Sequence, residues 1–368
     1  MKTGKHELQV WVLIAAWLYR MHFVIFIFME RDLQVQISKK TNLIHSQTAK
    51  KVMDKSSGNT RIIIKPSCNA TYLIWIVTSY AGDPSARSAL RRAYTNEELQ
   101  TLGIGRVFLL GTLNDDAKDR THVSQKALLD ESRRFGDILQ GNFLDTYRNL
   151  THKHLMGLRW AINNCEGVKY IMKMDDDIVV DIYGILEKLH SSVIEKDSLI
   201  GYSMRNMIPV RELANKWYAS KMEYAGNIYP DFISGWLYVT SPQIANWLTN
   251  YAETSSKYFW IDDVFVTGIL RKDLNIKIRD ISEIYTTDYR YLECCMKGRT
   301  NLLKCEFLIG PNGGDAELQV RFKKFAKFCH ANCSMRDENN LVGKTCVVAY
   351  KKPQLHKGTF QINPIKIL

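Results

Sequence analysis

The sequence predicts an α/β fold in which helices flank an open, mostly parallel sheet. Short apolar runs rich in β-branched residues alternate with segments whose apolar residues recur at helical spacing. The 368 residues are 46% hydrophobic and 24% charged, which is typical of a globular protein with a sizeable core. The first strand is not followed by Gly-x-Gly-x-x-Gly, and no phosphate-loop Lys motif occurs. These two absences disfavour dinucleotide oxidoreductases and phosphate-loop nucleotidases.

The N-terminal part of the chain has the features of a membrane anchor followed by a polar stem. Residues 8–29 are mostly apolar and numerous enough to span a bilayer. Arg20 and His22 interrupt this run, and a central Arg costs about 2.5–3.5 kcal/mol, which the apolar neighbours offset. We therefore expect a cytoplasmic tail and single-pass signal-anchor over residues 1–30 and a stem over residues 31–66. A cleaved signal peptide and a buried core helix are the alternatives.

Charge is distributed unevenly along the chain, whose net charge is +12. Residues 1–66 carry 11 basic and 4 acidic side chains, residues 67–295 carry 26 and 29, and residues 296–368 carry 13 and 5. A nucleic-acid reader places its basic surface on the functional domain, whereas the central region here is slightly acidic. We expect no nucleic-acid partner, and we set residues 296–368 apart as a basic, Cys-rich C-terminal extension.

Cysteines and glycosylation sequons favour an oxidising compartment. The chain has eight cysteines and three sequons, which begin at Asn69, Asn149 and Asn332. Cys329-His330 and Cys333 suggest a zinc site as an alternative. No regular pair-and-pair spacing supports zinc, so we expect disulfides.

Strand and helix signals alternate through the first part of the main domain. Residues 72–79 form a short apolar run that fits a strand buried on both faces. The signals that follow are a helix over about 86–100, a strand over 106–111, a polar helix over about 122–135 and a strand over 137–140. This alternation implies a parallel sheet.

An acidic triplet ends the fourth expected strand. A helix over residues 149–165 delivers the chain to a strand over residues 169–174, and Asp175, Asp176 and Asp177 follow directly. Open α/β sheets bind ligands at the carboxyl ends of their strands. Enclosed carboxylates repel one another unless a cation lies against them, and oxygen ligands without His or Cys suit Mg²⁺ or Mn²⁺. The triplet therefore predicts a metal site that also holds a diphosphate, with a solvated acidic turn as the alternative.

Five short blocks occur in order between residues 70 and 295. They are Arg87-Ser-Ala-Leu-Arg91, the stretch from Glu131 to Lys153, the stretch from Tyr170 to Val180, Tyr229-Pro-Asp-Phe-Ile-Ser-Gly235-Trp-Leu-Tyr238, and Ile261-Asp262-Asp263-Val264. Together they resemble the motifs of β-1,3-galactosyltransferase-type glycosyltransferases, which are Golgi type II membrane proteins. The resemblance implies a GT-A-like nucleotide-sugar-binding fold, a catalytic domain over residues 67–295 and a luminal location at the Golgi membrane.

The resemblance also implies a metal site and a base. Asp175 and Asp177 would hold Mn²⁺ (or Mg²⁺), which would stabilise charge on the leaving diphosphate. The family's downstream metal-binding His has no aligned counterpart, so His330 and His356 are only candidates. Inverting transfer needs a base for the acceptor hydroxyl, and Asp263 matches that position. Asp262 beside it would orient substrate or serve as the base instead.

Further residues take substrate-binding roles from the same resemblance. They are Arg87, Arg91 and Lys153 for the diphosphate or uridine, Asp137 and Asp145 for the base or ribose, Asp176 beside the metal, and Tyr229, Gly235 and Trp236 on the acceptor side. Without the resemblance, the basic residues would be read as solvated and the two lone Asp residues as helix caps or turn residues.

The resemblance predicts an inverting, metal-dependent hexosyltransferase. It would move galactose from UDP-galactose to a glycan hydroxyl on a protein or lipid, in β-1,3 linkage. The same motifs permit transfer of N-acetylglucosamine from UDP-GlcNAc. Ala93, Tyr94 and Leu237 depart from the family pattern, which suggests a catalytically idle glycan-binding relative as a second alternative. A third is a membrane-tethered, metal-dependent nucleotidase.

Overall fold

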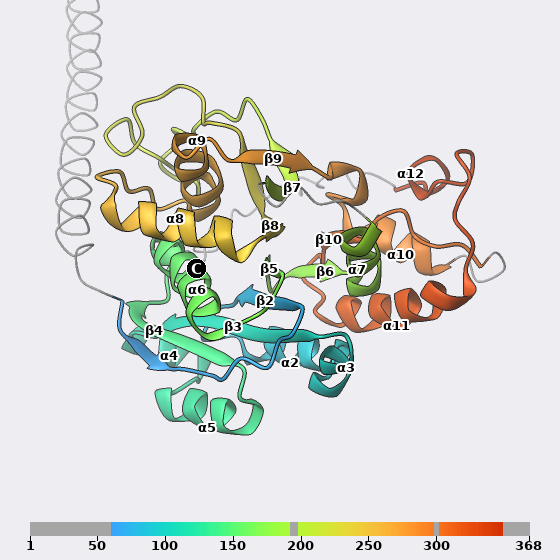
Figure 1. Cartoon of the computed structure of the whole chain (residues 1–368), viewed down its shortest axis with the longest axis horizontal. Coiled ribbons are helices and arrows are strands. Elements are labelled where there is room, and N and C mark those ends of the chain that lie inside the picture. Colours follow the sequence, from blue (N-terminus) through green and yellow to red (C-terminus); the bar gives the residue numbers. More distant parts are fainter. Residues whose placement is uncertain (1–59, 192–197, 298–301, 349–368) are drawn as a thin grey trace, which may run out of the picture. The chain divides into compact units, whose positions relative to one another are not determined.

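The computed structural model describes residues 60–191, 198–297 and 302–348, and an eight-stranded sheet lies at its centre (Figure 1). The strand order is β1-β4-β3-β2-β5-β8-β7-β9. These strands are β1 (Ile62–Ile64), β2 (Leu73–Thr78), β3 (Ile104–Thr112), β4 (Ile138–Leu144), β5 (Tyr170–Asp175), β7 (Ser198–Met204), β8 (Phe232–Thr240) and β9 (Lys277–Asp280). A separate two-stranded sheet pairs β6 (Ile178–Val180) with β10 (Ile309–Pro311).

Helices surround the sheet. They are α2 (Pro84–Ala93), α3 (Asn96–Thr101), α4 (Asp115–Thr121), α5 (Gln125–Phe135), η1 (Tyr147–Asn149), α6 (Leu150–Asn164), α7 (Ile182–Ser191), α8 (Pro242–Thr254), η2 (Val264–Leu270), α9 (Arg271–Asp273), η3 (Ser282–Ile284), α10 (Tyr289–Lys297), α11 (Glu317–Asn332) and α12 (Val342–Thr345).

The expected alternation of strands and helices over residues 72–174 is confirmed, with two differences. The helix expected over residues 86–100 is divided into α2 and α3. Tyr94 has an extended backbone, with φ −127° and ψ 101°, and the Thr95 side chain accepts the N–H of Glu98 to cap α3. Helix α4 was not expected. It begins after Asn114, whose side chain accepts the N–H of Ala117.

The eight-stranded sheet is mixed: four of its strand pairs are parallel, as the sequence predicted for most of the sheet, and three are antiparallel. Strands β4, β3, β2 and β5 run parallel, as expected. Strand β8 lies between β5 and β7 and is antiparallel to both. The sequence signal for β8 is weak because Ser234 and Gly235 interrupt its apolar run, and Gly has a low preference for strands.

The core occupies both faces of the central strands. In β2, Ile74 and Ile76 belong to the cluster that includes residues of α6 and α8, whereas Leu73, Trp75 and Val77 belong to the cluster that includes residues of α2 and α7. Successive side chains of a strand point to opposite faces, so helices on both sides require a continuous apolar run. The two helix layers lie on opposite sides of β2 and β3 in Figure 1.

The C-terminal part of the described chain packs onto the α/β unit. Strand β10 pairs with β6, which begins directly after the acidic triplet. Helix α11 contacts α2, α7 and β6. Leu318 and Phe322 of α11 are buried in one cluster with Val179 of β6. Residues 302–348 therefore help to support the segment that carries the triplet, although the basic, Cys-rich sequence of residues 296–368 predicts a separate extension.

All eight cysteines form disulfides, which confirms the preference for disulfides over zinc. The pairs are Cys68–Cys165, Cys294–Cys346, Cys295–Cys305 and Cys329–Cys333. Within the described ranges, no helix is long and apolar enough to cross a membrane. The expected anchor at residues 8–29 and most of the expected stem lie outside those ranges, as does His356.

Candidate functional site

A pocket of about 610 Å³ lies at the carboxyl end of β5. Its lining includes the acidic triplet, residues of β8, residues 261–263 before η2 with Val264 at the start of η2, and residues of the loop 205–231 that joins β7 to β8. Ten of the thirteen residues that the sequence assigns to the site line this pocket. They are Asp145, Lys153, Asp175, Asp176, Asp177, Tyr229, Gly235, Trp236, Asp262 and Asp263.

The acidic triplet forms the turn between β5 and β6. Asp175 ends β5, and the backbone N–H of Asp176 donates to the carbonyl of Thr78 at 3.1 Å. Burial raises the pKa of Asp175 to about 7 and that of Asp176 to about 6, and it also raises the pKa of Asp177. Among the described residues, no basic side chain forms an ion pair with Asp176 or Asp177. A cation in the pocket would relieve this uncompensated charge.

Lys173 precedes the triplet in β5 and connects Asp175 to β8 and to Asp262. Its ammonium donates to Asp175 Oδ1 at 2.6 Å and to the carbonyl oxygen of Gly235 at 2.7 Å, and it lies 3.8 Å from Asp262 Oδ2. Burial alone would lower the pKa of Lys173, but the charges of Asp175 and Asp262 raise it. The side chain therefore stays charged and fixes β5 against β8.

Asp262 is held in a buried hydrogen-bonded chain. His154 of α6 bonds to Asp262 Oδ2 through Nδ1 at 2.9 Å and to the Tyr238 hydroxyl through Nε2 at 2.6 Å. Burial lowers the pKa of His154, so the neutral ring donates from Nδ1 and accepts the Tyr238 hydroxyl at Nε2. Burial would raise the pKa of Asp262, but Lys173 and His154 lower it well below its usual value.

Asp263 faces Asp175 across Gly235. Its Oδ2 accepts the N–H of Gly235 at 3.2 Å, and its Oδ1 accepts the N–H of Val264 at 2.7 Å. A Cβ placed on Gly235 would lie 3.5 Å from Asp263 Oδ2 and 3.6 Å from Asp175 Oδ2. Glycine thus leaves open the space between the two carboxylates. Burial and the charge of Asp262 raise the pKa of Asp263 to about 7.

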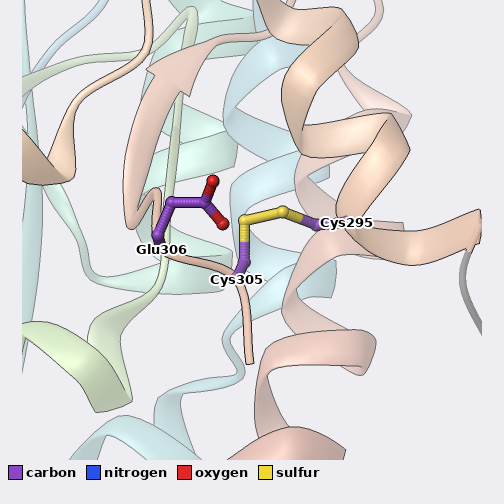
Figure 2. Close-up of side chains that lie close together, drawn as sticks. All are labelled: Cys295, Cys305 and Glu306. Carbon is purple, nitrogen blue, oxygen red and sulfur yellow. A yellow bond between two sulfur atoms is a disulfide. The ribbon is translucent and has the colours of Figure 1, made fainter. Parts of the chain in front are cut away.

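The chemistry of this pocket fits a hard divalent cation. Its lining offers several buried carboxylates, of which Asp176 and Asp177 have no ion-pair partner among the described residues. Asp175 and Asp177 are the residues that would hold the ion. In the described ranges, a closer cluster of ligand-type atoms occurs only at Cys295, Cys305 and Glu306 (Figure 2). The two sulfurs there form a disulfide, which removes the thiolates that a metal requires.

The candidate third metal ligand His330 lies elsewhere. It is on α11, where Nδ1 lies 2.9 Å from Glu187 Oε1 and the ring packs near that of Tyr183. It lines a second pocket, not the one that contains the triplet.

Arg87, Arg91 and Asp137 do not line the pocket. The guanidinium of Arg87 is fully buried, bonds to both oxygens of Glu131 and also donates to the carbonyl of Tyr80 at 2.7 Å. Arg91 bonds to both oxygens of Asp137 and to Glu131. These pairings fix α2 to α5 and to the residue just before β4, and they occupy the groups that the resemblance assigns to the donor.

Lys153 and Asp145 line the pocket but are bonded to each other. Lys153 Nζ donates to Asp145 Oδ1 and to the carbonyl of Ser79, both at 2.6 Å. Asp145 Oδ2 accepts the N–H groups of Ala81 and Gly111 at 3.0 and 2.9 Å. This buried pair joins α6 to the ends of β2 and β3, so most of its hydrogen-bonding capacity serves the fold.

Aromatic residues also line the pocket. Trp217 contacts Tyr147 edge to face, with ring centroids 5.0 Å apart. The Tyr229 hydroxyl is buried and has no hydrogen-bond partner among the described residues, which suits a ligand hydroxyl. Trp236 also lines the pocket and remains partly exposed. Such rings offer apolar faces on which sugars stack.

Four residues of this region were not predicted from the sequence. Lys173 and Asp175 are two apart in one strand, so alternation alone places them on the same face. His154 directly follows Lys153, the last residue of the second block. Tyr238 is the last residue of the fourth block, although no role was assigned to it. Lys216 gave no comparable signal, because its position depends on how the loop of residues 205–231 packs.

Comparison with known proteins gives consistent matches. The profile of the family described as galactosyltransferase matches residues 85–282. Beta-1,3-galactosyltransferase 5 of Homo sapiens is 31% identical over 260 residues, which cover 69% of this chain and 80% of that protein. The protein of the same name from Pan troglodytes is 34% identical over 230 residues, 62% of this chain and 75% of that one.

Two further proteins either cover a smaller share of this chain or have a lower sequence identity to it. Lactosylceramide 1,3-N-acetyl-beta-D-glucosaminyltransferase B of Xenopus laevis is 36% identical over 195 residues, which cover 52% of this chain and 51% of that protein. The solved galactosyltransferase LgtC, in complex with donor and acceptor sugar analogues, aligns over 74% of this chain and 99% of that one. The TM-score of this alignment is 0.33 and the sequence identity is 10%.

The family profile covers more than half of this chain and includes the acidic triplet, Gly235, Asp262 and Asp263. The resemblance inferred from the five blocks is thereby confirmed at the level of the family. The chain belongs to the galactosyltransferase family and is a glycosyltransferase.

Proposed function

We propose that this protein is an inverting, metal-dependent hexosyltransferase that moves galactose from UDP-galactose to a glycan hydroxyl in β-1,3 linkage. One observation supports this most directly: Asp175, Asp177 and Asp263 line one pocket, with Gly235 leaving space between Asp175 and Asp263. The proposal places the enzyme at the Golgi membrane as a single-pass type II protein, with residues 67–295 as the luminal catalytic domain. Its acceptor would be a glycan on a protein or lipid.

The carboxylates would divide the chemical work. Asp175 and Asp177 would hold Mn²⁺ (or Mg²⁺), and the bound ion would stabilise negative charge on the departing diphosphate. Asp263 would take the proton of the acceptor hydroxyl as that oxygen attacks the anomeric carbon from the opposite face. The backbone N–H groups of Gly235 and Val264 orient its two oxygens for this task.

Asp262 has a different role in this mechanism. Lys173 balances the charge of the Asp262 carboxylate, and the hydrogen bond from His154 orients it. Both interactions make Asp262 a poor proton acceptor. Its charge nevertheless raises the pKa of Asp263. We therefore assign proton transfer to Asp263 and orientation to Asp262.

A donor and acceptor screen tests the proposal. The purified full-length chain, with Mn²⁺, should transfer sugar from UDP-galactose to at least one glycan in a mixed panel, and chelation should stop the reaction. Asp177→Asn and Asp263→Asn should each abolish transfer without changing the thermal unfolding midpoint. Full activity in both variants would refute the mechanism, and release of free sugar without transfer would indicate a nucleotidase.

Transfer of N-acetylglucosamine is a second candidate. The Xenopus laevis relative is named as an N-acetyl-beta-D-glucosaminyltransferase and covers 52% of this chain. The same carboxylates would serve that reaction, because the change lies in the donor sugar. Competition between UDP-galactose and UDP-GlcNAc in the same assay distinguishes the two, since the preferred donor has the higher kcat/KM.

A further inference from the structure

Of the three basic residues that the resemblance assigns to the donor, two lie outside the pocket and the third is paired within it. Arg87 and Arg91 lie outside it and are paired with Glu131 and Asp137. Lys153 lines it but is 2% exposed and bonded to Asp145. The lining contains six Asp residues and, besides Lys153, one other basic residue. A diphosphate that enters this site needs positive charge from the protein as well as from a cation.

The other basic residue is Lys216, on the loop of residues 205–231. Among the described residues, no carboxylate forms an ion pair with its ammonium and no acceptor bonds to it. Lys216 Nζ lies 5.0 Å from the ring centroid of Trp217 and 5.8 Å from that of Tyr147. Both aromatic residues line the same pocket. The ammonium is thus held by two rings and keeps all three of its donors available.

Lys216 lines the same pocket as the residue that would hold the metal. Asp177 and Lys216 both belong to that lining. A diphosphate bound to a metal at Asp177 would therefore lie in the pocket that the Lys216 side chain lines.

The loop that carries Lys216 is well supported. Arg211 donates to the carbonyls of Ala219, Tyr224 and Gly226 at 2.6 to 2.8 Å. The N–H of Ala219 donates to the carbonyl of Val210 at 2.9 Å, and Ala219 is fully buried. These contacts hold the backbone of the loop, from which the exposed Lys216 extends into the pocket lining.

We propose that Lys216 binds the diphosphate of the nucleotide-sugar donor. This inference rests on the proposed function, because it assumes a nucleoside diphosphate in the pocket. Lys216 would supply a charge-assisted contact to the diphosphate from the loop of residues 205–231. Arg87, Arg91 and Lys153 would then support the fold around the donor without contacting its phosphates.

Binding of UDP and of uridine to the full-length chain with Mn²⁺, measured by isothermal titration calorimetry, tests this role. Loss of one charge-assisted hydrogen bond predicts that Lys216→Gln weakens UDP binding about tenfold. Uridine binding should not change, since uridine has no phosphate. Lys216→Arg should restore most of the UDP affinity. Lys221→Gln is the matched control: Lys221 lies on the same loop, outside the pocket lining, and bonds to Asn227 at 2.6 Å.

Three results would overturn the inference, and they are distinguishable. If the unmodified chain does not bind UDP with Mn²⁺, the proposed function fails and the role of Lys216 fails with it. If the unmodified chain binds UDP and Lys216→Gln binds it equally well, only the role of Lys216 fails. Equal weakening of UDP and uridine would show that Lys216 shapes the pocket and does not contact the phosphates.

Discussion

Asp262 and Asp263 are adjacent in the sequence but have opposite acid–base properties. Asp262 is stabilised as an anion by Lys173 and His154, whereas Asp263 receives only backbone N–H groups. The charge of Asp262 and burial then raise the pKa of Asp263 to about 7. A carboxylate with a pKa near the working pH is suited to proton transfer. Environment, not residue type, separates the two roles.

The raised pKa of Asp263 predicts a pH dependence. Only the ionised carboxylate accepts a proton, so kcat/KM should rise with pH, with the midpoint of this rise near pH 7. We call this rise the acidic limb of the profile, and a bound divalent cation would move it to lower pH. Replacing Asp262 with Asn removes the neighbouring negative charge, which lowers the pKa of Asp263. The limb of Asp262→Asn should therefore lie at lower pH than that of the unmodified enzyme.

The measurement is kcat/KM for the acceptor between about pH 5 and about pH 9 at saturating Mn²⁺ and donor. A limb that stays at the same pH in Asp262→Asn would contradict this account. The apparent pKa that this limb reports is a property of the Asp262–Asp263 pair, because the two carboxylates interact strongly.

At the scale of elements, the second small sheet and α11 decide where the triplet lies. Asp177 ends the turn after β5, and its carbonyl accepts the N–H of Asn312, which follows β10. Strand β6 begins at the next residue and pairs with β10. Phe322 of α11 is 1% exposed and packs in the cluster that contains Val179 of β6. The C-terminal elements therefore support the metal-binding side of the pocket.

This packing predicts that α11 contributes strongly to stability. Truncating a buried Phe leaves a cavity, so Phe322→Ala should lower the free energy of unfolding by about 3–5 kcal/mol. Phe328→Ala is the matched control on the same helix, because Phe328 is 50% exposed and its loss should change stability by only about 0.5 kcal/mol. Denaturant unfolding of both variants measures the difference. Equal losses in the two would contradict the assigned packing.

At the scale of the whole molecule, the pocket lies where the parallel part of the sheet meets the antiparallel part. Strand β5 contributes Asp175, and β8 contributes Gly235 beside it. Asp262 and Asp263 come from the segment just before η2, more than eighty residues after the triplet. A site drawn from several distant segments assembles only in the folded chain, so ligand binding should stabilise that chain.

Ligand-induced stabilisation is therefore expected. Mn²⁺ and UDP together, at about one hundred times their dissociation constant, should raise the free energy of unfolding by about 2.7 kcal/mol. Asp177→Asn should remove the part of this stabilisation that depends on Mn²⁺. Glu306→Gln should retain it, because the cluster of Cys295, Cys305 and Glu306 contains a disulfide and no thiolate. Thermal unfolding with and without ligands measures this, and loss of the Mn²⁺ effect in Glu306→Gln would place the ion elsewhere.

The sequence by itself determined the strands that carry the triplet, the presence of disulfides and the family. Buried parallel strands require continuous apolar runs, so residues 72–79, 106–111 and 169–174 were recognisable without tertiary information. The antiparallel position of β8 between β5 and β7 could not be recognised from the sequence, because strand order depends on contacts between distant segments. The same limit applies to the division of the helix expected over residues 86–100.

Only the tertiary structure decided what the charged residues face. Arg87, Arg91 and Lys153 look alike in sequence to cations that bind a diphosphate, but each is bonded to a carboxylate supplied by another part of the chain. Asp263 and Lys216 reach the pocket through the packing of η2 and of the loop of residues 205–231. The physical reason is that the periodicity of apolar residues along the chain indicates which residues are buried. An ion pair instead depends on which distant residues the fold brings within hydrogen-bonding distance.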